Sequence, residues 1–395
     1  MSQFKVVFFL FFYVLFICCA SETSEDTRRK VLTFSKDSVN KILIEINATE
    51  KTKKLDSLFK KKATLDGFNG CVLVAQRGQI IYKNAFGLSN FKTKDSLTIN
   101  SSFQLASASK TFTATAILIL ADQGKLLLTD NVQKFFPAFP YQGITIKLLL
   151  THRSGLFNYI YCCEKYCEKP NKYKKGLFDN AAMMEVITTH TCDVFAQPNK
   201  KFEYSNTNYA ILACIVEKVS GLCFADYMEQ TIFKPLGMND TWVHNPKGSI
   251  IHKNKTMGHK ASGSLEDETY ADDVVGDKGI YSTVEDLLKW DQSFYTDNLL
   301  KKTTIEKAFT GYSNEHKGKR NYGYGWRITD DGKSPKIIYH NGWWHGYNSL
   351  FFRRPSDQTT IIVLGNKYNR STYQIQGVLS ILNSNSSAMD FEGSE

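Results

Sequence analysis

The stretch that decides the fold is FQLASASKTFTATAILILADQGK, residues 103–125, and it predicts one buried helix. Nearly all of its side chains are small or apolar, yet Lys110 stands near its beginning, three residues after Ser107. Burying an ammonium group costs free energy unless other groups pair with it. Residues three apart share one face of a helix, so Ser107 and Lys110 are expected to lie side by side.

A serine and a lysine in this arrangement suit nucleophilic catalysis. A serine hydroxyl is a weak nucleophile until a base takes its proton, and a desolvated lysine can be that base or act on it. The beginning of a helix also stabilises developing negative charge. The SxxK pattern alone is weak, because it occurs, among other places, at Ser38, Ser57, Ser89 and Ser107. Only the last of these opens an apolar helix after a strand-like segment.

Two further motifs carry suitable chemistry. In FEYSNTNYAILACIVEKVSG, Tyr204 and Asn206 precede an apolar helix. A tyrosine can relay a proton, and an asparagine amide can both donate to and accept from a substrate amide. In IIYHNGWWHGYNSLFF, the triplet HNG at residues 340–342 ends a strand, where its glycine lets a substrate approach the backbone.

The three motifs resemble those of the serine β-lactamase-like family. This family includes class C β-lactamases, low-molecular-weight penicillin-binding proteins, D,D-peptidases, D-aminopeptidases and related esterases. The motifs occur in the family's order, SxxK, YxN and H/KxG, at Ser107, Tyr204 and His340. The stretches ITIKLLLTHRSGL, IFKPLGMNDT, GIYSTVEDLLKW and YGYGW also resemble family signatures. The likeness covers residues 65–383.

The resemblance implies a role for each matching residue. Ser107 would be the acylated nucleophile, and Lys110 and Tyr204 would share the general-base work. The backbone N–H groups of Ser107 and Trp343 would form an oxyanion hole. The implied substrate-binding residues are Asn206, His340, Asn341, Gly342 and Trp343. The implied reaction needs no metal and no cofactor.

Two residues depart from the family pattern. His340 takes the place of the lysine in class C β-lactamases, as in many D,D-peptidases, D-aminopeptidases and esterases. Asn341 replaces a small or hydroxyl residue, which puts a contact to a substrate carboxylate in doubt. We therefore do not expect an efficient β-lactamase. His152, in the THRSGL stretch, is interpreted as structural.

The order of the elements predicts an α/β (α+β) fold. Residues 70–90 predict a hairpin that turns at Arg77 and Gly78, and residues 325–366 return to strand character. Helical patterns dominate at about 125–270. We expect an antiparallel sheet lobe flanked by terminal helices, with an all-helical lobe inserted, as in β-lactamases and transpeptidases. The catalytic cleft is expected at the junction of the two lobes.

The beginning of the chain predicts export. One lysine precedes an apolar run that is too short to span a membrane, so residues 1–20 are interpreted as a signal peptide. The alternatives are a lipid anchor at Cys18 or Cys19 and an uncleaved anchor. The mature protein would be periplasmic, secreted or lipid-anchored. It would comprise a helical lead-in (21–64), a hydrolase domain (65–385) and a mobile tail (386–395).

The cysteines and the charge add further expectations. In an exported protein, Cys162, Cys163, Cys167 and Cys192 predict one or two disulfides around a polar insertion, with the pairing open. A zinc site with His190 is the alternative reading. The formal charge of +10 is scattered and predicts a solvated basic surface rather than a nucleic-acid site. Cys71 and Cys214, in apolar runs, are expected to be buried thiols.

Two hypotheses of function follow. The first is an exported serine hydrolase that forms an acyl-enzyme at Ser107 and cleaves an ester, a D-amino-acid amide or peptide, or a β-lactam. The second is a catalytically inactive protein of penicillin-binding type that binds peptidoglycan or a protein partner. The choice of substrate depends on loops that line the site, and the oligomeric state is left open.

Overall fold

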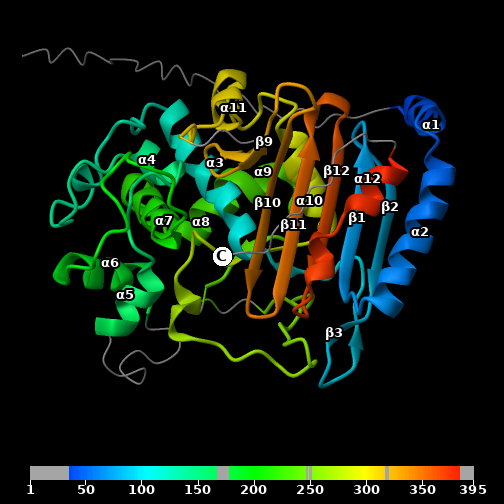
Figure 1. Cartoon of the computed structure of the whole chain (residues 1–395), viewed down its shortest axis with the longest axis horizontal. Helices are drawn as coiled ribbons and strands as arrows, with labels where there is room; N and C mark the ends of the chain where they lie inside the picture. The colour runs from blue at the N-terminus through cyan, green and yellow to red at the C-terminus, as the bar shows by residue number, and fades with distance from the viewer. Residues whose placement is uncertain (1–34, 167–177, 246–247, 249–250, 316–319, 383–395) are drawn as a thin grey trace, which may run out of the picture.

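The computed structural model describes residues 35–166, 178–245, 248, 251–315 and 320–382. A large sheet lies beside a group of helices, and further helices cover the faces of the sheet (Figure 1). The sheet has the strand order β2-β1-β12-β11-β10-β9-β8, and all of its neighbouring strands are antiparallel. Its strands are β1 (Gly70–Gln76), β2 (Gln79–Phe86), β8 (Arg320–Tyr322), β9 (Arg327–Thr329), β10 (Ile337–Trp344), β11 (Tyr347–Arg354) and β12 (Thr359–Gly365).

The helices fall into two groups. The first is inserted in the middle of the chain, with α4 (Ile146–Leu150), α5 (Tyr159–Tyr166), α6 (Asn180–Thr189), α7 (Asn206–Ser220), α8 (Phe224–Met228) and α9 (Lys234–Leu236). The remaining helices are α1 (Lys36–Glu45), α2 (Ala48–Leu65), α3 (Ser109–Asp122), α10 (Val284–Ser293), α11 (Lys302–Ala308) and α12 (Gln376–Ile381). Figure 1 shows α4–α8 on one side of the sheet and α1 and α2 at its far side, with α3 between β10 and the inserted helices.

Single turns and short strands complete the described chain. The turns are η1 (Ala106–Ala108), η2 (Val132–Lys134), η3 (Glu229–Phe233, a π-helix), η4 (Tyr270–Asp273), η5 (Pro355–Asp357) and η6 (Arg370–Tyr373). Strand β3 (Leu88–Asn90) pairs with β4 (Asp95–Ser96), and β7 (Ile280–Ser282) lies between β5 (Phe103–Gln104) and β6 (Trp242–Val243).

Both faces of the sheet are buried, which explains why its strands read as continuous apolar runs. Alternate residues of a strand point to opposite faces. In β1, Cys71 and Leu73 join the core that contains α3 and α10. Val72 and Val74 join a second core with residues of α2 and α12. Since β1 pairs with β12, the first and last strands of the sheet in sequence are neighbours within it.

These observations confirm the predicted fold class, an antiparallel sheet with terminal helices and an inserted helical region. The hairpin is confirmed, because β1 and β2 pair across the turn at Arg77 and Gly78. The polar segment before the sheet contains α1 and α2. Cys71 and Cys214 are buried thiols, as predicted. A disulfide joins Cys162 to Cys192, which supplies the pairing that the sequence left open.

The prediction of one helix over residues 103–125 is wrong at its beginning. Phe103 and Gln104 form a strand that pairs with β7, and α3 begins only at Ser109. The reason is the backbone of Ala106, whose φ of 48° lies in the left-handed region and cannot continue a helix. The predicted end is confirmed, since Gly124 follows the helix with a φ of 72°.

Some expectations lie outside the described residues. They concern the signal peptide at 1–20, a lipid on Cys18 or Cys19, the pairing of Cys167 and the tail at 386–395. Among the helices that the structure describes, none is both long enough and apolar enough to cross a membrane. Likewise, no three histidine, cysteine or acidic side chains of the described residues gather as a metal site would require.

A buried ion pair fastens α10 to the sheet and gives a first prediction. The Arg353 guanidinium on β11 donates to Asp291 Oδ1 at 2.8 Å, and the Thr360 hydroxyl on β12 donates to Asp291 Oδ2 at 2.8 Å. Both ionic side chains are shielded from solvent. Removing one partner leaves the other buried charge without a counter-charge. We expect Asp291→Ala to lower the free energy of unfolding by about 3–5 kcal/mol in chemical denaturation.

An exposed ion pair provides the control. Lys54 and Glu50 pair on the outer surface of α2, and such pairs contribute about 0–1 kcal/mol. A loss on Asp291→Ala no larger than the loss on Lys54→Ala would contradict the assigned role of the buried pair.

Candidate active site

The structure brings the SxxK and YxN motifs together between the sheet and the inserted helices. Ser107 lies in η1, Lys110 lies in the first turn of α3, and Asn206 is the first residue of α7. Helix α3 packs against α7, while η1 packs against β10, the strand that carries the HNG triplet. The site is therefore assembled from three segments that are far apart in the sequence.

Lys110 is the centre of this arrangement. Its Nζ lies 2.8 Å from Ser107 Oγ and donates to Asn206 Oδ1 at 2.7 Å and to the carbonyl oxygen of Asp277 at 3.0 Å. The side chain is fully buried. An ammonium group has three donors, and three acceptors surround it here. The apolar helix can thus hold a lysine because its polar atom is fully hydrogen-bonded.

Asp277 was missed by the sequence analysis. It contributes a backbone carbonyl, which every residue type possesses, so no side-chain pattern could have identified it.

Tyr204 lies beside this lysine. The Lys110 Nζ is 4.9 Å from the centroid of the tyrosine ring, and the guanidinium carbon of Arg327 is 5.2 Å from it. Two cations near one aromatic ring stabilise its electron-rich face and any negative charge that develops on its oxygen. Arg327 lies in β9 and was also missed, since nothing in the GWRI stretch distinguishes it from a surface residue.

His152 has the structural role expected of it. Its Nδ1 accepts a hydrogen bond from the backbone N–H of Ser205 at 3.2 Å, and its ring lies 4.2 Å from that of Tyr204. Burial, with the charges of Lys110 and Arg327 nearby, holds the pKa of His152 well below its usual value. A neutral imidazole therefore supports the loop that carries Tyr204.

Strand β10 approaches the nucleophile most closely at Gly342. A Cβ atom built there would lie 2.5 Å from Leu105 O and 2.6 Å from Ser107 N. Only a residue without a side chain allows this contact. Strand β9 pairs with β10 only over Ile337–Tyr339. The remainder of that edge of β10, after Tyr339, faces η1 instead.

The residues of the third motif differ in exposure. The His340 ring is fully buried; its Nδ1 donates to Asn341 O at 2.7 Å, and its Nε2 accepts from the Tyr322 hydroxyl at 3.0 Å. Burial, with Arg327 and Lys110 nearby, holds the pKa of His340 well below its usual value, so the ring is neutral. Asn341 is also buried, whereas Trp343 is 40% exposed.

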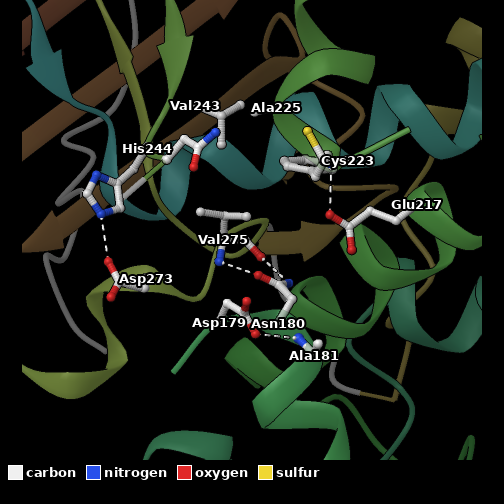
Figure 2. A pocket seen from close by; sticks show the side chains of 12 residues that line it. Asp179, Asn180, Ala181, Glu217, Cys223, Ala225, Val243, His244, Asp273 and Val275 are labelled. Carbon is white, nitrogen blue, oxygen red and sulfur yellow. Dashed lines mark hydrogen bonds and ion pairs between the residues drawn. The ribbon is translucent and has the colours of Figure 1, made fainter. Parts of the chain in front are cut away.

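A separate pocket of about 610 Å³, measured with its open mouth, is lined by residues of α6, α7 and α8 (Figure 2). None of the predicted site residues lines it. Its polar side chains form hydrogen bonds within the protein. The Asn180 amide bonds the backbone N–H and C=O of Val275, and His244 bonds Asp273 at 2.9 Å. The contacts visible in Figure 2 hold loops together and do not extend the candidate active site.

The close approach at Gly342 predicts a large effect of one methyl group. Gly342→Ala must push β10 away from η1, and a displacement of about 1 Å at a reacting group can cost about 100-fold in rate. We expect acylation of Ser107 by a fluorophosphonate probe to slow by about that factor. Gly377→Ala in α12, where a Cβ meets only the flexible side chain of Leu58, is the control. Equal rates in the two variants would contradict the proposed contact.

The two buried, neutral histidines predict a pH dependence of stability. Below the unfolded-state pKa of about 6.5, the unfolded chain takes up protons that the folded protein excludes. Stability is therefore fully present above this pH and falls below it, by up to about 1.4 kcal/mol per pH unit for each histidine. We expect the free energy of unfolding to fall between pH 7.5 and 5.0, and His340→Gln to flatten that slope. The exposed His190→Gln is the control, and an unchanged slope in His340→Gln would contradict the assignment.

Comparison with known proteins agrees with this geometry. The family model described as Beta-lactamase matches residues 55–379. Penicillin-binding protein 4* of Bacillus subtilis (strain 168) is 34% identical over 341 residues, which cover 82% of this chain and 74% of that protein. Protein flp of Staphylococcus aureus (strain N315) is 26% identical over 75% of this chain and 59% of that protein.

Solved structures show the same fold. The penicillin-binding protein homologue from Pyrococcus abyssi, described as octameric, superposes with a TM-score of 0.70 and 26% identity, covering 84% of this chain and 78% of that one. The family supports a role as a serine hydrolase or a penicillin-binding-type protein. Because the family model spans most of the chain and a relative is 34% identical over 82% of it, the protein belongs to the beta-lactamase family.

Proposed function

We propose that this protein is an exported serine hydrolase that forms an acyl-enzyme at Ser107. The observation that carries the proposal is the hydrogen bond of 2.8 Å between the buried Lys110 Nζ and Ser107 Oγ. A base within hydrogen-bond reach of a hydroxyl is the arrangement that nucleophilic catalysis requires. Residues 1–20 would direct export.

The proposed reaction has two steps. When Lys110 is in its neutral form, its lone pair takes the proton of the Ser107 hydroxyl while Oγ attacks the substrate carbonyl carbon. The bond to the leaving alcohol or amine then breaks, and the leaving group takes a proton from Lys110 or Tyr204. Water attacks the resulting ester in the second step, which releases the acid and returns the proton to Ser107.

The backbone around Ser107 suits stabilisation of the developing oxyanion. Gly342 brings the β10 backbone against Ser107 N. Trp343, which carries the second N–H group, is the next residue of the same strand. Two N–H groups aimed at one oxygen form an oxyanion hole, and one such donor contributes about 3 kcal/mol to transition-state stabilisation. The left-handed backbone of Ala106 turns the chain directly before Ser107.

The third motif favours some substrates over others. The proposed substrates are esters, D-amino-acid amides or peptides, and β-lactams. Where class C β-lactamases have a lysine, His340 is neutral and buried, so it supplies no charge to a substrate carboxylate. This argues for slow turnover of β-lactams compared with esters or D-amides.

The alternative is a catalytically inactive protein that keeps the fold and binds peptidoglycan or a partner. The observed contacts of Lys110 with Ser107 and Asn206 argue against it. Binding without turnover on an ester, D-peptide and β-lactam panel would favour it.

Covalent labelling tests the proposal. We expect a fluorophosphonate or penicillin probe to form one adduct, located on Ser107 by peptide mass spectrometry. Ser107→Ala should abolish the adduct, and Lys110→Met should slow its formation by about 100- to 10,000-fold, because the general base is lost.

The chain offers a matched control in another SxxK sequence. Ser57 and Lys60 lie on the exposed side of α2, and Ser57→Ala should leave labelling unchanged. Equal labelling of the wild type and Ser107→Ala would overturn the proposal.

A further inference from the structure

Asp277, whose carbonyl accepts a hydrogen bond from Lys110, is followed by another buried lysine that has no assigned role. Lys278 lies in the loop before β7 and is only 3% exposed. Its Nζ donates to the Tyr159 hydroxyl at 2.6 Å and to the carbonyl of Val274 at 2.9 Å. It also forms an ion pair with Asp277 Oδ1 at 3.6 Å. A buried ammonium group therefore lies one residue from the backbone carbonyl that contacts the general base.

The Tyr159 hydroxyl connects the two charged side chains. It accepts from Lys278 and donates to Asp277 Oδ2 at 3.5 Å. Burial, with the carboxylate of Asp277 nearby, holds the pKa of Tyr159 well above its usual value, so the hydroxyl keeps its proton. The Tyr159 N–H donates to Thr207 Oγ1 at 2.7 Å, and Thr207 follows Asn206 in the first turn of α7. We refer to Asp277, Lys278 and Tyr159 as the supporting cluster.

The backbone of the loop gives little restraint to the peptide whose carbonyl faces the general base. This peptide bond joins Asp277 to Lys278, and Gly276 and Gly279 flank the two residues. The φ angles of these glycines are 105° and 91°, in a region that glycine enters without strain. The same freedom opens other orientations of the peptide to the chain. The side chains on either side of this peptide pair with each other and with Tyr159, which favours the observed orientation.

The supporting cluster is enclosed by the protein. Asp277 is 1% exposed and Tyr159 is fully buried. The Lys278 Nζ lies 4.9 Å from the centroid of the Trp344 ring on β10, and the Trp344 indole N–H donates to Asp272 Oδ1 at 2.6 Å. Removing one charge of such a pair leaves the other charge buried and uncompensated. The cluster therefore holds one arrangement against solvent.

We propose that Lys278 is a positioning residue for the general base and acts through the carbonyl of Asp277. A lysine side chain is long and flexible, and the Lys110 amine must face Ser107 Oγ to take its proton. The Asp277 carbonyl, held by Lys278 and Tyr159, keeps the Lys110 Nζ in that position. This inference rests on the proposed acyl-enzyme at Ser107 and deepens it by assigning the residues that orient its base.

A charge-balanced variant separates positioning from stability. Lys278→Met leaves the Asp277 carboxylate unpaired and should destabilise the fold. Lys278→Met/Asp277→Asn removes both charges, so much of that stability should return, although the ion pair that holds the peptide is absent. In both variants we expect kinact, the maximal rate constant of fluorophosphonate labelling, to fall by at least about tenfold. KI, the probe concentration at half the maximal rate, should stay unchanged because the cluster is buried.

Lys62→Met is the matched control. Lys62 is also buried, and its Nζ donates to the backbone carbonyl of Ser371 at 3.1 Å. It lies in α2, which packs on the face of the sheet opposite to α3. Its replacement should lower the free energy of unfolding and leave kinact unchanged. A wild-type kinact in the folded double variant would overturn the proposal, as would an equal fall of kinact in Lys62→Met.

Tyr159→Phe tests the supporting cluster without a change of charge. It removes one hydroxyl and keeps the ion pair, so this variant should fold even where the charge variants do not. We expect kinact to fall by about three- to tenfold, the effect of one hydrogen bond, with KI unchanged. If neither charge variant folds, an unchanged kinact in Tyr159→Phe would overturn the proposal.

A crystal structure of the double variant separates this inference from the proposed function. We expect the carbonyl of residue 277 to turn out of hydrogen-bond reach of Lys110 Nζ, from the 3.0 Å of the wild type. If that hydrogen bond is retained while Ser107 is labelled normally in the wild type, the positioning role alone is refuted. If the wild type is not labelled, the acyl-enzyme is refuted, and a displaced carbonyl in the variant still supports the positioning of Lys110.

Discussion

The hydrogen bonds of one buried ammonium group organise this protein. Lys110 has no contact with solvent, yet it belongs to an otherwise apolar helix at the centre of the larger core. A buried cation is tolerated only where its donors are satisfied. Ser107, Asn206 and the carbonyl of Asp277 satisfy them from three different segments. Lys110 Nζ, the atom that would activate the nucleophile, thus also holds α7 and the loop before β7 in place through its hydrogen bonds.

A steric constraint on the backbone adds to the hydrogen-bonding constraint at Lys110. The strand that carries the third motif lies so near η1 that only glycine fits at position 342. Directly before Ser107, Ala106 takes a left-handed conformation that separates strand β5 from helix α3. Both features hold the nucleophile at a fixed place between sheet and helices, and fixed placement is a large part of what catalysis of this kind requires.

Charge is distributed unevenly over the molecule. Around Tyr204, Lys110 and Arg327 are cationic, while the buried rings of His152 and His340 stay neutral. Positive charge therefore gathers beside the tyrosine ring that would relay a proton.

Local patterns in the sequence determined the fold class and the grouping of the motifs. Strand-like segments at both ends and helical patterns between them led to the sheet with inserted helices, and three motifs in order led to the family. The tertiary structure alone decided where α3 begins, because pairing of Phe103 and Gln104 with β7 is a contact between distant segments. It also decided that Asp277 and Arg327 border the site and that the His340 ring is buried. A backbone carbonyl has no sequence signature, and burial depends on what packs against a residue, so neither could be inferred from the chain itself.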